Sequence, residues 1–140
     1  MDDFSQIYPL EFYIQGTPRS LQAQNKADWK ADVAGAAKSR IDEMKEWFFL
    51  DERPLALTIY FFPVAPWPGD VDNIVKPIQD ALIKVAYRDD HQVERVVVQK
   101  FEPEEDWDIL EPSARLAEAL DIAPPVVYVR VDDDLGWRNL

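Results

Sequence analysis

The stretch LALTIYFFPVAPWPGDVDNIVKPIQDALIKVAYRDDHQVERVVVQKF, residues 55–101, determines the fold of this chain. Its first nine residues are almost continuously apolar, which is typical of a strand in the centre of a sheet. From residue 72 the apolar positions change to helical spacing, and residues 93–101 are again typical of a strand. Both strands must lie close together to bury their apolar side chains. The stretch therefore predicts a strand, a helix and a second strand in one unit.

The flanking sequence adds further elements to this unit. We predict a strand at 7–14, a helix within 20–48, a short helix at 113–120 and a strand at 126–131. Pro9 indicates an edge position for the first of these strands, because proline donates no ladder hydrogen bond. The chain is thus expected to form one α+β domain over residues 1–140, with a mixed sheet of about four strands and helices packed on it. Residues 131–140 are expected to form a loosely held tail.

Capping residues define where the two longer helices are expected to begin. Asn25 together with Asp28 predicts the start of the first helix, and either Asp72 or Asn73 is expected to cap the second. Pro77 is expected in or near the first turn, where the missing N–H matters least.

The bulk composition indicates a packed, intracellular protein. Hydrophobic residues make up 47% of the 140 residues, and the absence of cysteine excludes disulfides, zinc–thiolate sites and thiol nucleophiles. No stretch approaches the ~18 apolar residues of a membrane span, and the N-terminus lacks the features of a signal peptide. We therefore expect a cytoplasmic protein. The net charge is −12, and the acids are concentrated from residue 102 to the end of the sequence, where eleven acids stand against three bases.

Acidic side chains gather around the predicted second helix. Asp70 and Asp72 lie at its start, and the pair Asp89–Asp90 follows it. Such carboxylates repel each other unless a cation lies between them. If Asp90 points to the same side as Asp70, three carboxylates converge, and their oxygens suit Mg²⁺. Lys76, four residues after Asp72, would lie beside this site and stabilise charge on a phosphoryl group.

Ordinary structural roles explain each of these residues when it is taken alone. Asp72 can be a helix cap, Asp89–Asp90 a solvated turn, and Lys76 a partner in an i,i+4 surface pair. A calcium loop of the EF-hand type does not fit. Val75 occupies the required glycine place and Ala81 the place of the bidentate glutamate. The spacing alone therefore indicates a metal site and no particular reaction.

The combined pattern resembles the RusA family of Holliday junction resolvases. The first segment is D-x-D-N-x-x-K-x-x-x-D-A-L, which begins at Asp70 and ends at Leu82. The second is D-D-x-Q, which runs from Asp89 to Gln92. The resemblance is strong over residues 69–93 and is compatible in length and element order elsewhere.

The resemblance implies a homodimeric, Mg²⁺-dependent endodeoxyribonuclease that resolves four-way DNA junctions by paired phosphodiester hydrolysis in recombination and repair. Mn²⁺ is a possible substitute, and no nucleotide cofactor or membrane partner is implied. By the resemblance, Asp70, Asp72 and Asp90 are the catalytic, metal-binding carboxylates and Lys76 is their charged partner. Supporting roles are expected for the remaining motif residues, Asn73, Asp80, Asp89 and Gln92.

Basic residues near the predicted site are candidates for contacts with the DNA backbone. These are Arg19, Lys84, Arg88 and Lys100. Trp67 suits packing better than stacking on an unpaired base, and His91 suits a polar turn better than a general base.

Two alternatives stay open because the chain is acidic, whereas nucleic-acid affinity normally depends on Lys and Arg. One is a catalytically silent acidic protein of the same fold that binds a basic protein partner. The other is a metal-dependent nuclease for another branched or flap substrate.

Overall fold

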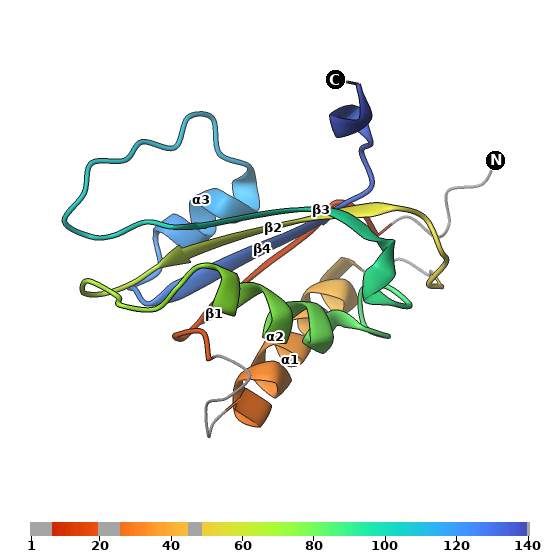
Figure 1. Cartoon of the computed structure of the whole chain (residues 1–140), viewed down its shortest axis with the longest axis horizontal. Coiled ribbons are helices and arrows are strands. Elements are labelled where there is room, and N and C mark those ends of the chain that lie inside the picture. The colour runs from red at the N-terminus through yellow and green to blue at the C-terminus, as the bar shows by residue number, and fades with distance from the viewer. Residues whose placement is uncertain (1–6, 20–25, 45–48, 140) are drawn as a thin grey trace.

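Four strands form one mixed sheet in the order β1-β4-β2-β3 (Figure 1). The computed structural model describes residues 7–19, 26–44 and 49–139. Its strands are β1 (Leu10–Gln15), β2 (Leu55–Phe62), β3 (Val93–Lys100) and β4 (Val126–Asp132). β2 is central, parallel to β3 and antiparallel to β4, while β1 is an edge strand that pairs with β4. The predicted central strand, the edge strand after Pro9 and the α+β class are confirmed.

Helices cover the two faces of the sheet unequally. The helices are α1 (Lys26–Met44), α2 (Asp72–Leu82) and α3 (Ala114–Leu120), with short 3-10 turns η1 (Asp90–Gln92) and η2 (Gly136–Arg138). Figure 1 shows α1 and α2 on one face of the sheet and α3 on the other. Within the described ranges, no helix has both the length and the apolar character needed to cross a membrane.

The alternation of side chains along β2 separates two packed regions. Leu57, Ile59 and Phe61 are fully buried against α1 and α2. The intervening residues face α3, where Phe62 and Tyr128 belong to a smaller buried cluster. Because each strand side chain points to the face opposite its neighbours, one sheet supplies both clusters.

Helix α2 begins at the predicted residue, but its cap differs from the sequence prediction. The residue before α2 is Val71, which cannot accept a side-chain capping bond, so neither Asp72 nor Asn73 is the cap. Instead, Asn73 N–H donates to the carbonyl of Asp70 at 3.1 Å. Pro77 lies in the second turn, not the first, so the carbonyl of Asn73 has no helical N–H to accept from. The predicted cap Asn25 lies outside the described residues.

The short helix α3 is fixed to β1 through its cap. Ser113 Oγ accepts from Leu116 N–H at 3.1 Å and donates to Glu11 Oε1 at 2.5 Å. Tyr128 OH donates to the same oxygen of Glu11 at 2.5 Å. These bonds hold the start of α3 against the sheet, and Tyr13 OH donates to Glu118 Oε1 at 3.2 Å nearer its end.

The C-terminal segment makes more contacts than a loosely held tail. Its first two residues belong to β4. Trp137 Nε1 donates to Glu94 Oε1 at 3.2 Å, and the guanidinium of Arg138 forms an ion pair with the same carboxylate. This pair lowers the pKa of Glu94, mainly through the hydrogen bond from Arg138.

Candidate functional site

Helix α2 has one apolar face and one charged face. Ile74, Ile78 and Leu82 are fully buried against the sheet. The residues between them, Lys76 and Asp80, therefore lie toward the outside. The helix itself presents the charged part of the first motif segment at the surface.

Lys76 connects the two motif segments. Its Nζ lies 2.8 Å from Asp90 Oδ2 and 3.1 Å from Asp80 Oδ1. The hydrogen bond to Asp90, and then that to Asp80, raise the pKa of Lys76, so its ammonium is fully charged at neutral pH. Lys30 of α1 lies 3.8 Å from Asp80 Oδ2. Two lysines from two helices thus surround Asp80, and one of them reaches Asp90.

Gln92 fixes the turn that carries Asp90. Its side chain is only 4% exposed, and its Oε1 accepts from the backbone N–H groups of Arg88 and Asp89 at 2.9 and 3.1 Å. Its Nε2 donates to the carbonyls of Asp51 and Arg53 at 3.0 and 2.9 Å. Because all four partners are backbone groups, Gln92 holds this turn against the segment that precedes β2.

Asp89 and His91 interact with each other at the outer side of this turn. His91 Nδ1 lies 3.2 Å from Asp89 Oδ2. The hydrogen bonds from His91 and then from Asp90 lower the pKa of Asp89. Both side chains are well exposed, which agrees with a polar turn role for His91.

A second set of contacts fixes the loop that precedes Asp70. Lys100 Nζ donates to the carbonyls of Trp67 and Gly69 at 3.1 and 3.2 Å and lies 3.2 Å from Glu102 Oε1. Glu102 Oε2 accepts from Trp67 N–H at 3.1 Å. The Trp67 ring packs edge-on against Phe61, which confirms a packing role. Lys100 was predicted to contact DNA, but its ammonium is occupied by this loop.

The predicted convergence of Asp70, Asp72 and Asp90 is absent. In the part of the chain that the structure describes, no three acidic or histidine side chains are grouped so that they could hold a metal ion. The topology explains this result, because Asp72 follows the end of β2 whereas Asp90 precedes the start of β3. The two carboxylates therefore lie toward the two ends of the connection between these strands, with most of α2 between them. Lys76, about 6 Å along the helix from Asp72, spans part of this gap.

Asp70 and Asp72 are exposed, and neither carboxylate has a hydrogen-bond or ion-pair partner among the described residues. Their side chains are therefore free to turn. The donor set consists of carboxylate oxygens, which suit a hard cation such as Mg²⁺. The chemistry of these residues fits a metal, although the side-chain positions do not form a closed cluster.

The other predicted DNA contacts are at the surface. Lys84 and Arg88 are exposed, and Arg88 makes only a 4.0 Å contact with Glu52. Arg19 is exposed beside Thr17 and Asp28, at the end of β1. Asn73 is exposed at the start of α2.

Sequence reasoning missed two residues that position the site. Glu102 holds the loop before Asp70, and Lys30 lies beside Asp80. Neither belongs to the motif, and both come from elements distant in sequence. Only the packing of α1 and β3 around α2 makes them neighbours of the site.

Comparison with known proteins places this arrangement in a family. A family model described as Endodeoxyribonuclease RusA matches residues 11–106, which include all but the first residue of β1 and both motif segments. No curated protein matches the chain.

Proposed function

The chain belongs to the RusA family of endodeoxyribonucleases, the Holliday junction resolvases, and we propose from this that it cuts four-way DNA junctions with the α2 side of the molecule. One observation carries the assignment of the site. Lys76 Nζ lies 2.8 Å from Asp90 Oδ2, so the two motif segments meet in space. A helix surface pair alone would require only Asp80.

Asp70, Asp72 and Asp90 are proposed as ligands of Mg²⁺, with Mn²⁺ as a possible substitute. When bound, the metal supplies a Lewis acid and lowers the pKa of a water molecule. Among the described residues, the exposed carboxylates of Asp70 and Asp72 have no competing partner, which leaves them available as ligands. Because the three carboxylates do not form a closed cluster, those of Asp70 and Asp72 would have to turn toward Asp90 to share one ion. Binding by Asp90 requires that its carboxylate be shared with, or released by, Lys76.

Asp80 gives Lys76 a second anionic partner. When Asp90 engages a cation, Lys76 keeps the 3.1 Å contact with Asp80 Oδ1 and stays beside the site. Its ammonium can then stabilise negative charge that develops on the phosphoryl oxygens. Asp80 and Gln92 are therefore proposed as positioning residues, Gln92 because it fixes the turn before β3. Asn73 and Asp89 are proposed in supporting roles at the two ends of the site.

Paired cuts in a two-fold symmetric junction need two such sites. We propose a homodimer for this reason, since each subunit then cuts one strand. The exposed Arg19, Lys84 and Arg88 are proposed backbone contacts. The domain is proposed to comprise residues 1–140 and to act in the cytoplasm.

The test is cleavage of an end-labelled synthetic four-way junction with Mg²⁺ at low salt, beside a linear duplex of the same sequence. We expect paired nicks in the junction only. The Asp72→Asn variant should lower the rate by at least about 100-fold, as expected for loss of a metal ligand. Its matched control is Asp42→Asn, an exposed aspartate on α1 with the same charge change.

The control should cleave like the parent chain. If Asp72→Asn and Asp42→Asn lowered the cleavage rate equally, the effect would come from the change in charge and not from the site. A folded parent chain that leaves junction, flap and duplex DNA uncut would overturn the proposal.

A further inference from the structure

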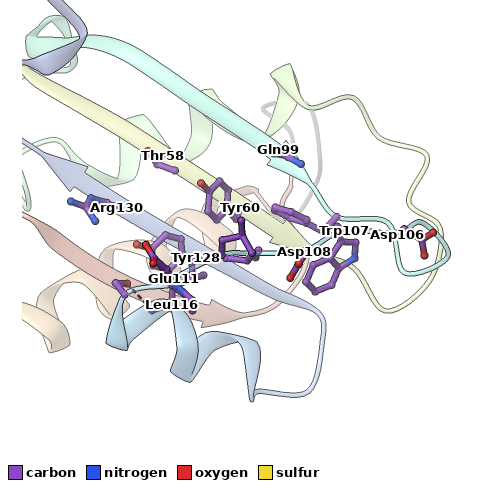
Figure 2. A pocket seen from close by; sticks show the side chains of 15 residues that line it. Thr58, Tyr60, Gln99, Asp106, Trp107, Asp108, Glu111, Leu116, Tyr128 and Arg130 are labelled. Carbon is purple, nitrogen blue, oxygen red and sulfur yellow. Dashed lines mark hydrogen bonds between the residues drawn. The ribbon is translucent and has the colours of Figure 1, made fainter.

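A cavity of about 670 Å³ lies on the sheet face opposite α2. The segment 106–113 and the start of α3 form its outer side, and strands β2, β3 and β4 form its floor (Figure 2). Figure 1 shows the long segment between β3 and α3 on this side, away from α1 and α2. The cavity is therefore separated by the sheet from the proposed nuclease site.

Aromatic rings form a continuous series along the cavity. Tyr60 stacks on Tyr128 with ring centroids 5.6 Å apart and meets Phe101 edge-on at 5.4 Å. Trp107 packs against Phe101 at 5.2 Å, yet it remains 44% exposed. Leu110, also in the lining, is 78% exposed. Large apolar side chains exposed around a hollow are typical of an interaction site.

Three carboxylates line the same cavity without a cationic partner. These are Asp106, Asp108 and Glu111, and none forms an ion pair with a described residue. The one basic residue in the lining, Arg130, already donates to Asp132 Oδ2 at 3.0 and 3.2 Å. The cavity is thus negative, with its single positive charge compensated from within the chain.

We propose that this cavity binds a lysine- or arginine-bearing segment of a partner protein. A cation beside Tyr60 or Trp107 interacts favourably with the ring face, and the nearby carboxylates neutralise its charge. Leu110 and the exposed part of Trp107 then contact apolar side chains of the same segment. Charge complementarity selects this occupant, because the segment 102–111 carries six acids and no base.

The same charges disfavour the two other macromolecular occupants. Phosphate groups of DNA would meet unpaired carboxylates, with no free base in the lining to attract them. A second copy of this chain would bring its own three unpaired acids to the contact, and like charges at an interface are repulsive. The proposal is independent of catalysis, since no cavity residue belongs to the motif.

The probe is a fluorescein-labelled peptide of alternating arginine and leucine, and its affinity for the full chain is measured by fluorescence anisotropy. The same peptide with glutamate in place of arginine serves as the peptide control. In the test variant, Asp106→Asn, Asp108→Asn and Glu111→Gln are combined. In the matched control, Glu104→Gln, Glu105→Gln and Asp42→Asn remove the same charge from exposed residues outside the cavity.

We expect the test variant to raise the Kd at least 10-fold and the matched control to raise it less than 3-fold. Peptide binding should also shift the NMR signal of the Trp107 indole N–H. The Asp72→Asn variant should bind the peptide with the same Kd as the parent chain. Equal loss in both charge variants would overturn the proposal, because bulk charge would then explain the affinity. Self-association of the parent chain that the test variant abolishes would also overturn the proposal, since a second copy would then be the occupant.

Discussion

Replacing Gln92 by glutamate is expected to destabilise the fold strongly at neutral pH. The substitution keeps the size and shape of the side chain. One carboxylate oxygen can still accept from Arg88 and Asp89, but the other now faces the carbonyls of Asp51 and Arg53, to which Nε2 donates in the parent chain. Because the site is only 4% exposed, water cannot replace the two lost donors.

The loss of folding free energy in Gln92→Glu depends on whether the introduced carboxyl is protonated. A protonated carboxyl can donate to one of the two carbonyls, so only one hydrogen bond is lost, at a net cost of about 1 kcal/mol. Burial and the facing carbonyls raise the pKa of the introduced carboxyl in the folded state. If this rise is about two units, the further cost at pH 7 is roughly 3 kcal/mol. The total of about 4 kcal/mol is a large part of a typical folding free energy.

The pH dependence has a definite sign. An acid whose folded pKa is raised binds more protons in the folded state than in the unfolded state, so stability falls as pH rises through that range. The deficit of Gln92→Glu should therefore be largest at pH 7 and shrink toward about 1 kcal/mol near pH 4. The assay is urea unfolding at several pH values, followed by tryptophan fluorescence.

The matched control is Gln99→Glu, which adds the same charge to an exposed glutamine on β3. Subtracting its effect at each pH removes the general cost of one more negative charge. A difference of less than about 1 kcal/mol at pH 7, or a difference that does not change with pH, would refute the buried four-bond role of Gln92.

Two further outcomes follow from the contacts of the site and of the sheet. A Cβ at Gly69 would lie 2.4 Å from the Trp67 ring. Gly69→Ala should therefore displace the loop before the first motif aspartate and lower junction cleavage at least about 10-fold. Normal cleavage by this variant would contradict the prediction. Hydrogen bonds from Arg53 lower the pKa of Asp51. Arg53→Met should therefore reduce the urea midpoint at pH 7, and this effect should become progressively smaller as the pH falls below the usual carboxyl range. An equal reduction at pH 7 and pH 3 would contradict this linkage.

Periodicity was sufficient to predict the elements and the central position of β2, but not the strand order of the sheet. The apolar run of β2 gave a central strand, and the buried positions Ile74, Ile78 and Leu82 gave the orientation of α2. The start of α2 at Asp72 was predicted correctly, but its cap was predicted wrongly, because a backbone contact to the carbonyl of Asp70 replaces a side-chain cap. Local sequence does not distinguish these two ways of satisfying the first N–H groups.

The arrangement of the candidate site was predictable only in part. The motif supplied Lys76 and Asp90, but their contact depends on how the turn before β3 is rotated relative to α2. That rotation is fixed by Gln92 through carbonyls about forty residues earlier in the chain. Long-range backbone contacts of this kind leave no pattern in the local sequence. The spacing of the acids therefore predicted that three carboxylates converge, which the structure does not show.

The acids of segment 102–111 affect DNA binding at the proposed site little, because the sheet lies between them and α2. The six acids of segment 102–111 accompany α3, whereas Lys30 and Lys76 lie on the α1 and α2 side (Figure 1). A helix layer and a sheet layer separate the two groups by more than about 10 Å, which exceeds the screening length in physiological salt. A phosphate that approaches α2 is therefore affected mainly by nearby charges. On the two proposals made above, the net charge of −12 would be divided between a surface for DNA and a surface for a basic protein segment.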